Sequence, residues 1–380
     1  MIAQSCMDIS LASPLLGGLS PQTFMRRHWQ KKPLLVRQAV PGGLDLVSRA
    51  QLIALAAHEE VESRLVVRRA ERWSLRQGPL TRAAMPPFKQ PNWTLLVQGV
   101  DLHLPAARAL LDRFRFVPDA RLDDAMISFA TDGGGVGPHV DSYDVFLLQT
   151  HGRRRWSIGR LKTPELVADV PLKILANFEP EQSFLLEAGD MLYLPPGWAH
   201  DGVAQGECMT CSIGFRAAGR DELAREVVQR LLDGADLDER GPLYRDPTLD
   251  ASAEPGRIPP ALQAFATDAV ARLLADPRAL ACSLGEVLSE PKRGVWFDAD
   301  KRGVDGSGGV RLDQRSRALY DDDHVFINGE SFRASGRDAR LMRRLADRRA
   351  LQAADVAALS EGARALVDDW LDAGWLQPDD

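Results

Sequence analysis

A change in residue pattern near residue 217 limits the possible folds more than any other feature of this chain. From Thr23 to about Phe215 the sequence consists mostly of short runs of β-forming residues, separated by glycine and proline. After Gly219 apolar residues recur at helical spacing instead. The first pattern is typical of strands and the second of amphipathic helices. We therefore expect an α+β protein with a β-rich domain that ends near residue 217.

The β-rich part also contains signals for individual elements. Strands are expected at residues 64–69, 125–130 and 190–194. Ser48 is expected to cap a helix that extends to His58, and Pro105 to begin another helix, because serine suits the N-cap position and proline the first helical turn. These helices interrupt an otherwise β-rich domain.

Helical signals dominate the next segment, which we place at residues 218–282. Asp221 is expected to cap its first helix, and a second helix is expected over residues 261–275. Both helices have an apolar face, so they are candidates for contacts between two copies of the chain.

The last segment, residues 283–380, combines short strands and helices. Strands are expected at residues 294–297 and 324–327, the second followed by an Asn-Gly turn. Helices then follow, in which Trp370 and Trp375 are expected to be core residues. This order predicts a winged-helix-like domain.

Composition excludes several classes of protein. The 380 residues include 47 Lys and Arg against 53 Asp and Glu, a net charge of −6, which does not fit a basic nucleic-acid-binding protein. A hydrophobic fraction of 45% is enough for a sizeable core. The four cysteines are too few for a disulfide scaffold and favour a reducing compartment, the cytoplasm. We find neither a signal peptide nor an apolar run of the ~20 residues that a membrane span needs.

The strongest chemical signal is a glycine-rich segment that ends in His139-Val-Asp141. Side chains alternate along a strand, so His139 and Asp141 emerge on the same face. His200, at the end of a Gly-Asp…Pro-Pro-Gly segment, is a candidate third ligand. Two histidines and one carboxylate leave open positions on iron for a co-substrate and oxygen. The alternative is a buried hydrogen-bonded His139–Asp141 pair, with His200 in a loop.

An arginine run, residues 153–155, follows this segment and could bind a carboxylate co-substrate through a planar guanidinium. In an extended strand Arg154 and Trp156 point to one side and Arg153 and Arg155 to the other, so only one side can enter a barrel. The alternation alone does not decide which side. His151, just before the run, is expected on a surface turn.

Two further patterns could indicate a functional site, but we favour a structural explanation for each. Cys208-Met-Thr-Cys211 has the spacing of a redox or zinc motif, but on a strand the two thiols point to opposite faces and pack in the core. Arginines of the C-terminal domain (Arg343, Arg344, Arg348 and Arg349) could indicate DNA binding. Nearby aspartates favour a docking surface or a solvated face instead.

Several motifs together resemble bacterial JmjC-type ribosomal oxygenases of the cupin superfamily. The resemblance includes the His139/Asp141/His200 set and extends over most of the chain, through residues 24–35, 144–146, 152–156 and 326–329. It implies a double-stranded β-helix, the cupin/JmjC jelly roll, for residues 1–217. It also implies a dimerisation region at 218–282 and a winged-helix-like domain at 283–380.

The implied activity is hydroxylation of an arginine side chain in a large-subunit ribosomal protein, with Fe(II) as cofactor and 2-oxoglutarate and O2 as co-substrates. Residue by residue, His139, Asp141 and His200 would be iron ligands, and Arg154 with Ser128 would hold the distal carboxylate of 2-oxoglutarate.

Other positions are implied more loosely. Met209, Thr210 or Ser212 would complete the co-substrate pocket. Tyr143 and Asp144 are candidates for contact with the substrate guanidinium, although Asp144 could instead cap a turn.

The expected partners are therefore the ribosomal protein and a second copy of the chain, with no membrane and no nucleic acid except through the ribosome. Two alternatives stay open. The same chemistry could act on another protein, on histidine or on RNA. The chain could also be a non-catalytic cupin-like DNA-binding regulator.

Overall fold

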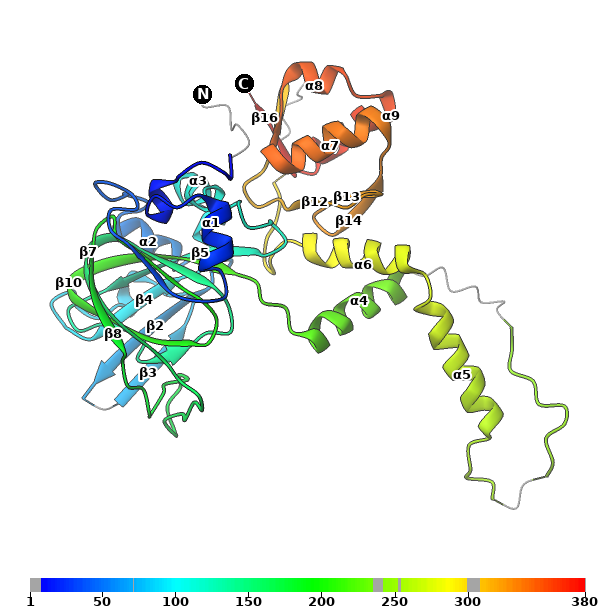
Figure 1. Ribbon diagram of the computed structural model, residues 1–380, viewed down its shortest axis with the longest axis horizontal. Coiled ribbons are helices and arrows are strands. Elements are labelled where there is room, and N and C mark those ends of the chain that lie inside the picture. Colours follow the sequence, from blue (N-terminus) through cyan, green and yellow to red (C-terminus); the bar gives the residue numbers. More distant parts are fainter. Residues whose placement is uncertain (1–7, 71, 235–241, 252–253, 299–307, 380) are drawn as a thin grey trace. The chain divides into compact units, whose positions relative to one another are not determined.

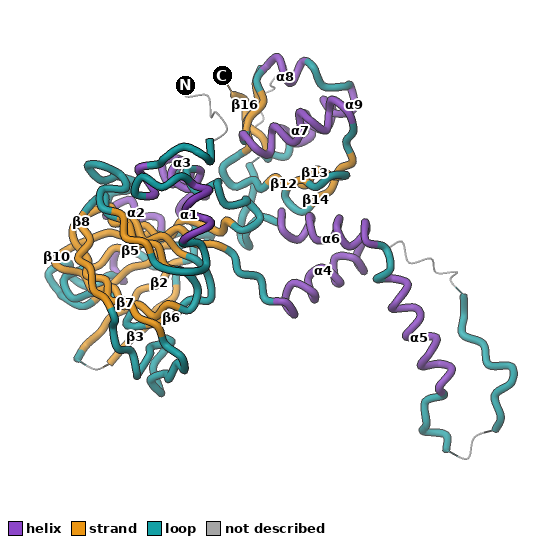
Figure 2. Tube along the Cα trace, in the orientation of Figure 1, coloured by secondary structure: helices purple, strands orange, loops and turns teal. Residues whose placement is uncertain are grey.

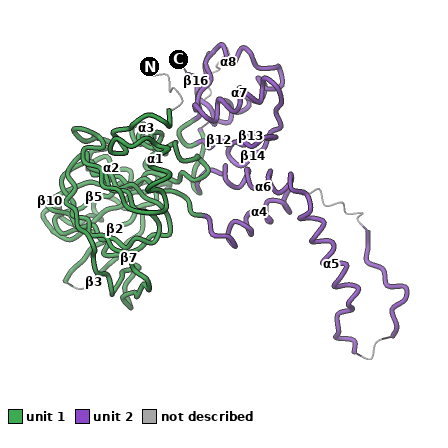
Figure 3. The backbone as a smooth tube through the Cα atoms, in the orientation of Figure 1, with its two compact units in different colours: residues 1–217, 293–297, 313–315 green, residues 218–292, 298–312, 316–380 purple. Residues whose placement is uncertain are grey.

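The computed structural model describes residues 8–70, 72–234, 242–251, 254–298 and 308–379. It divides into two compact units (Figure 3). The ranges of the first unit are Met1–Ala217, Arg293–Phe297 and Asp313–Arg315. The ranges of the second are Ala218–Lys292, Asp298–Leu312 and Ser316–Asp380. The expected boundary between residues 282 and 283 falls inside helix α6 (Pro277–Ser289), so the division of the chain into three domains remains a prediction.

The first unit is built on one ten-stranded sheet (Figures 1 and 2). Its main path runs β1-β9-β7-β10-β5-β4-β2-β3, β6 pairs with β10 and β8 pairs with β7, and every pairing is antiparallel. The strands are β1 (Leu34–Val36), β2 (Ser63–Arg69), β3 (Arg72–Gln77), β4 (Trp93–Val97), β5 (Leu122–Ala130), β6 (His139–Val140), β7 (Val145–Arg160), β8 (Gln182–Glu187), β9 (Met191–Leu194) and β10 (Trp198–Phe215). The strands expected near residues 64–69, 125–130 and 190–194 are confirmed as β2, β5 and β9.

Two long strands join the two halves of this sheet. The first half of β7 pairs with β9 and its second half with β8, while β10 pairs with β7 along most of its length. In the same way, the start of β10 pairs with β6 and its end with β5. The shared strands therefore pass from one layer of a folded-over sheet to the other, which is the architecture of the jelly roll expected for this domain.

Gly152 lies where β7 changes partner. Its φ is +65°, a left-handed conformation that glycine adopts without strain. A Cβ at this position would lie 2.2 Å from the carbonyl oxygen of Glu207, and the β7–β10 register shifts between Gln205 and Met209. His151 is thus exposed as expected, but it lies within β7 beside a bulge and not on a turn.

The two faces of the long strands belong to different cores. Phe146 and Leu148 on β7 pack in the largest hydrophobic cluster, which also includes Phe24 of α1 (Pro21–Arg27). Leu147, between them, belongs to a second cluster with Trp156 and residues of β8 and β9. This second cluster lines the inside of the barrel, since its members come from strands of both layers.

Local capping explains where the early helices begin. Helix α2 (Arg49–Leu55) starts after Ser48, whose side chain forms a reciprocal capping box with Gln51. Helix α3 (Pro105–Asp112) starts with its proline. Both expected helices are confirmed, although α2 ends three residues before His58.

The second unit begins with three helices, α4 (Arg220–Gly234), α5 (Pro260–Leu273) and α6, of which α4 packs against α6. Asp221 lies within the first turn of α4 and not at the cap position before it, where its charge still favours the helix N-terminus. None of the described residues of α5 is buried. Leu262, Phe265 and Val270 of α5 therefore stay exposed among the described residues, although the ring of Tyr244 contacts that of Phe265.

The rest of the second unit has two three-stranded sheets and three helices around their own core, in which Trp370 is buried and Trp375 partly buried. Its elements are β11 (Gly309–Leu312), β12 (Ala318–Tyr320), β13 (His324–Ile327), β14 (Glu330–Arg333), α7 (Gly336–Arg348), β15 (Ala350–Leu351), α8 (Ala353–Ala357), α9 (Glu361–Asp372) and β16 (Leu376–Asp379). The hairpin turn at Asn328-Gly329 is confirmed, with positive φ at both residues. The strand expected at 294–297 is wrong, because this segment is irregular and Trp296 is 72% exposed.

None of the helices in the described ranges is long and apolar enough to cross a bilayer.

Candidate metal and co-substrate site

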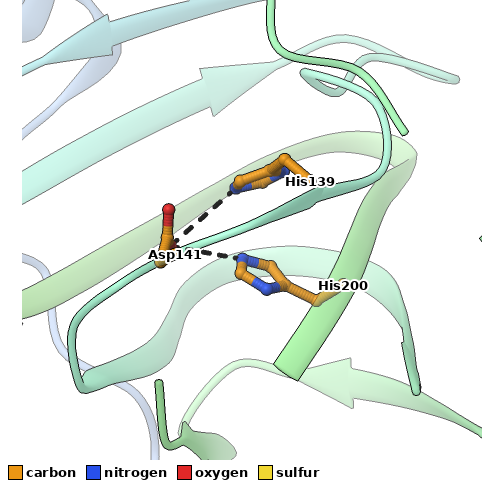
Figure 4. A group of neighbouring side chains, drawn as sticks. All are labelled: His139, Asp141 and His200. Carbon is orange, nitrogen blue, oxygen red and sulfur yellow. Dashed lines mark ion pairs between the residues drawn. The ribbon is translucent and has the colours of Figure 1, made fainter. Parts of the chain in front are cut away.

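The structure brings the side chains of His139, Asp141 and His200 together (Figure 4). His139 opens β6 and pairs directly with His200 of β10, so the two rings lie 4.2 Å apart between centroids. Asp141 follows two residues after His139 and shares its side of the chain. One possible ligand atom from each residue lies within 4.8 Å of the others. Two chain segments distant in sequence, residues 139–141 and β10, thus create a compact set of donors.

Backbone carbonyls orient both imidazole rings. Nδ1 of His139 lies 2.9 Å from the carbonyl oxygen of Gly137, and Nδ1 of His200 lies 3.0 Å from that of Trp198. Each carbonyl can only accept, so Nδ1 carries the hydrogen and Nε2 keeps its lone pair. Both Nε2 atoms face Asp141, at 4.0 Å from Oδ2 for His139 and 3.6 Å for His200. Two imidazole nitrogens and one carboxylate oxygen form the facial set that suits non-haem Fe(II).

The electrostatics of this set also fit a divalent cation. Burial, assisted by the neighbouring charge of His139, lowers the pKa of His200 to about 3, so its imidazole is neutral at physiological pH. Burial raises the pKa of Asp141, although His139, a hydrogen bond from Tyr143 and the charge of Arg64 oppose the shift. A cation between these side chains would offset the cost of burying the carboxylate.

Arg154 is the buried cation of the barrel interior. It is 4% exposed, and its Nη1 donates a hydrogen bond to Oγ of Ser128 at 3.1 Å. Its Nε and Nη2 are buried without a hydrogen-bond partner among the described residues. A guanidinium with two unpaired donors suits a carboxylate ligand, because a carboxylate can accept two parallel hydrogen bonds from it. Arg153 and Arg155 are exposed, so the structure resolves the question that strand alternation left open.

The β7–β10 register connects this arginine to the metal-ligand set. His200 pairs with Ile158, Gly202 with Trp156 and Ala204 with Arg154. Directly paired residues in a sheet share a face, so Arg154 and His200 point to the same side, two rungs apart. The arrangement can bind a small molecule with a metal-chelating group at one end and a carboxylate at the other.

The structure also separates the other candidates for this pocket. Thr210 and Ser212 lie on the same face of β10, and Thr210 pairs directly with Ser128 of the neighbouring strand β5. Thr210 Oγ1 donates a hydrogen bond to Gln149 Oε1 at 2.9 Å. Met209 points the other way, into the cluster around Phe24. Thr210 or Ser212, and not Met209, can therefore line the co-substrate side.

Tyr143 and Asp144 occupy different environments. Tyr143 is 39% exposed, and its pKa is raised by burial and by the negative charges of Asp141, Asp124 and Asp123. Asp144 is fully buried. Its carboxylate accepts hydrogen bonds from Tyr193 Oη at 2.5 Å and from Gln30 Nε2 at 3.1 Å. Contact between Asp144 and a substrate would require the core to open, so these contacts favour a structural role, and the substrate contact expected for Asp144 stays a prediction.

The cysteine pair agrees with core packing. Cys208 lies in a small cluster with Ala130 and Ala204, and Cys211 in the main cluster on the other face. Both thiols are buried, and burial raises the pKa of Cys211. The two side chains cannot hold one metal.

Two features of the site had no clear sequence signal. Arg64 of β2 influences Asp141 and Tyr143 electrostatically, and it comes from a strand distant in sequence. Gly202 lies against Trp156, and a Cβ there would come within 2.6 Å of the indole. The alternation His200, Gly202, Ala204 could have pointed to the second feature, but nothing in the sequence indicates the first.

Comparison with known proteins gives the family. A JmjC domain model matches residues 109–223 and a ROXA-like winged-helix model matches residues 272–377. The chain is 35% identical over 339 residues to the ribosomal protein uL16 3-hydroxylase of Escherichia coli, which covers 83% of this chain and 86% of that protein. The chain belongs to the JmjC family of ribosomal oxygenases. The cupin fold and the winged-helix domain expected from sequence are thereby confirmed.

Two further relatives agree. A probable ribosomal oxygenase of Haemophilus influenzae is 33% identical over 66% of this chain and 59% of its own length. A solved structure of YcfD, a ribosomal oxygenase from Escherichia coli, in complex with cobalt and 2-oxoglutarate matches with a TM-score of 0.79 and 30% identity, over 95% of this chain and 99% of that one. Together with the His-Asp-His set, these matches identify the present protein as a 2-oxoglutarate-dependent hydroxylase with Fe(II) as its metal.

Proposed function

We propose that this oxygenase hydroxylates an arginine side chain of a large-subunit ribosomal protein, with His139, Asp141 and His200 as its Fe(II) ligands. Arg154 and Ser128 would bind the distal carboxylate of 2-oxoglutarate. The observation that carries the proposal is the buried guanidinium of Arg154, which has two donors without partners and lies on the same barrel face as His200. Hydroxylation of an unactivated C–H bond by O2 is the chemistry that Fe(II) and 2-oxoglutarate supply together.

The chain itself contributes orientation and exclusion of water. The carbonyls of Gly137 and Trp198 hold the imidazoles with their lone pairs toward the metal position. Arg154 fixes the far end of the co-substrate, so the metal-chelating end has one orientation. The apolar cluster around Trp156 would exclude water from the space between the metal ligands and Arg154. Charged interactions are stronger in such a low-dielectric environment.

The ribosomal substrate is supported by the similarity to the relative from Escherichia coli, a ribosomal protein uL16 3-hydroxylase. An arginine target is supported by the surroundings of Tyr143. This exposed ring lies in the field of Asp123, Asp124 and Asp141. An aromatic face beside carboxylates suits a guanidinium, through cation–π and charge-assisted contacts. A ribosomal substrate would place the enzyme in the cytoplasm.

The test is mass spectrometry of unmodified large-subunit ribosomal proteins incubated with Fe(II)-loaded enzyme, 2-oxoglutarate and O2. We expect one added oxygen on an arginine, and none with His139→Ala. Succinate formation without modified arginine would refute the substrate while retaining the oxygenase, and another protein, histidine or RNA would then be tested. DNA binding that survives His139→Ala, without any turnover, would support the regulator instead.

We also propose that the protein is a homodimer whose interface includes α5. Among the described residues of this helix none is buried, while the chain exposes Leu262, Phe265 and Val270 there. Apolar side chains in one uncovered helix favour burial against a second copy. Sedimentation equilibrium should give a dimer at micromolar concentration, and Leu262→Asp with Val270→Asp should give monomers. A wild-type monomer under the same conditions would refute the proposal.

A further inference from the structure

Trp156 lies between the metal-ligand set and Arg154 on the inner face of the barrel. The β7–β10 register places Trp156 opposite Gly202, one rung from the His200–Ile158 pair and one rung from the Ala204–Arg154 pair. The indole is 5.8 Å from the ring of His200 between centroids, and the guanidinium carbon of Arg154 is also 5.8 Å from its centroid. A ligand that reaches from the metal position to Arg154 must pass this side chain.

The indole N–H of Trp156 has no hydrogen-bond partner among the described residues, although the side chain is only 5% exposed. Buried donors are almost always paired, because an unpaired one loses its bond to water without replacement. In the described part of the chain four buried side-chain atoms have this property, and three of them belong to Arg154 and Trp156. Unsatisfied donors are therefore concentrated on one face of one strand.

The position of the indole is also constrained by its neighbours. Gly202 lies directly beneath it, and an added Cβ would come within 2.6 Å of the six-membered ring. Trp156 packs as well with the apolar side chains of β8 and β9. The ring is thus held in place, and its N–H is pre-oriented before any ligand binds.

We infer that the indole N–H of Trp156 is a second donor to 2-oxoglutarate, and that it binds an oxygen at the metal-proximal end of the molecule. The inference rests on the proposed roles of Arg154 and the His-Asp-His set. Arg154 satisfies the distal carboxylate, so the donor one rung nearer to His200 serves the other end. A neutral donor suits this place, because it adds no charge beside the cation.

The competing explanation is that Trp156 only fills the apolar cluster. Trp156→Phe separates the two roles, since it keeps an aromatic ring and removes the N–H. Trp93→Phe is the matched control, because Trp93 is a fully buried tryptophan of the same unit whose Nε1 already donates to the carbonyl oxygen of Pro87 at 3.3 Å. Arg154→Met serves as the reference for loss of the distal contact.

The experiment is isothermal titration calorimetry of Mn(II)-loaded protein without O2, with 2-oxoglutarate and with 2-oxovalerate, which lacks the distal carboxylate. We expect Trp156→Phe to weaken both ligands by about tenfold, as the loss of one hydrogen bond to a charged acceptor predicts. Affinity for Mn(II) should not change, and Trp93→Phe should bind both ligands as the wild type does. Arg154→Met should weaken only 2-oxoglutarate.

Three outcomes would overturn the inference. Binding of 2-oxoglutarate by Trp156→Phe within twofold of the wild type would reduce Trp156 to packing. An effect seen with 2-oxoglutarate and absent with 2-oxovalerate would move the donor to the distal end. An equal effect of Trp93→Phe would mean that any buried indole lost from this unit weakens the site. Unchanged affinity in Arg154→Met, by contrast, would refute the proposed pocket itself.

A measurement on the wild type covers the case in which Trp156→Phe does not fold. The chain has eight tryptophans, so protein labelled with 15N-tryptophan gives at most eight indole N–H signals. With Zn(II) bound, addition of 2-oxoglutarate should move one of these signals downfield, as a new hydrogen bond requires. If none moves, the inference is wrong.

Discussion

Replacement of Arg154 by methionine should separate the stability of the protein from its function. The Arg154 side chain is a buried cation that, among the described residues, makes a hydrogen bond only to Ser128, whose hydroxyl in turn donates to the carbonyl oxygen of Thr210 at 3.4 Å. A charge held in this way costs desolvation free energy that a single neutral acceptor does not repay. Methionine has similar length and adapts to irregular space. We therefore expect the unliganded Arg154→Met variant to be as stable as the wild type or more stable, by up to about 4 kcal/mol.

The ligand should reverse this order. At 2-oxoglutarate concentrations of about 100 times the dissociation constant, binding should add about 2.7 kcal/mol to the free energy of unfolding of the wild type. For a unit of this size that corresponds to roughly 5–10 °C in the melting temperature. The variant should gain clearly less at the same concentration, because it lacks the guanidinium that holds the distal carboxylate. Thermal unfolding with Mn(II), with and without 2-oxoglutarate, measures both effects.

Arg153→Met is the matched control. Arg153 is the preceding residue on the same strand, and it is exposed on the opposite face. This variant should respond to 2-oxoglutarate as the wild type does. Equal stabilisation of Arg154→Met by the ligand, or an unliganded melting temperature well below that of Arg153→Met, would refute the reasoning.

Three other predictions follow from the described contacts. Gly202→Ala should cost about 1–3 kcal/mol by overpacking, because its Cβ would lie 2.6 Å from the Trp156 ring; urea denaturation measures the loss. Asp190→Asn should cost about 2 kcal/mol at neutral pH, because the Asp190 carboxylate accepts hydrogen bonds from Arg37 at 2.6 Å and from two backbone N–H groups. Burial raises the pKa of Asp190, but these hydrogen bonds outweigh it and lower the pKa below the ordinary value for aspartate. The advantage of the wild type is therefore present above the pKa of the unfolded state and is lost as pH falls through the lowered pKa of the folded state. His139→Ala should abolish tight Mn(II) binding, as measured by calorimetry, with the fold retained by circular dichroism.

Each of these predictions has its own control. Gly214→Ala tests the first, since Gly214 lies on the same strand and its Cβ would have an ordinary 3.6 Å contact; an equal loss there would show that the cost does not come from contact with Trp156. For Asp190→Asn, a constant difference from the wild type between pH 7 and pH 2 would contradict the linkage. For the metal site, His151→Ala removes an exposed histidine and should leave Mn(II) affinity unchanged.

Local chemistry made much of the fold predictable. The capping box of Ser48 with Gln51, the proline that opens α3 and the Asn328-Gly329 turn depend on neighbours within a few residues. His139 and Asp141 are separated by one strand repeat, so their common face also follows from sequence. The failures were local as well: residues 294–297 are rich in strand formers, but no neighbouring strand pairs with them in the described structure.

Sequence by itself thus determined the residue types of the site and which of them alternate together, because alternation along a strand is a property of the chain. Only the tertiary structure decided which face of β7 is inside, and so that Arg154 is buried while Arg153 and Arg155 are exposed. It also decided that Asp144 belongs to the core and Tyr143 to the surface, and that Trp156 stands between Arg154 and the metal ligands. The physical reason is that burial and cross-strand register arise from packing between segments distant in sequence, and the energies of those contacts are not contained in any local pattern.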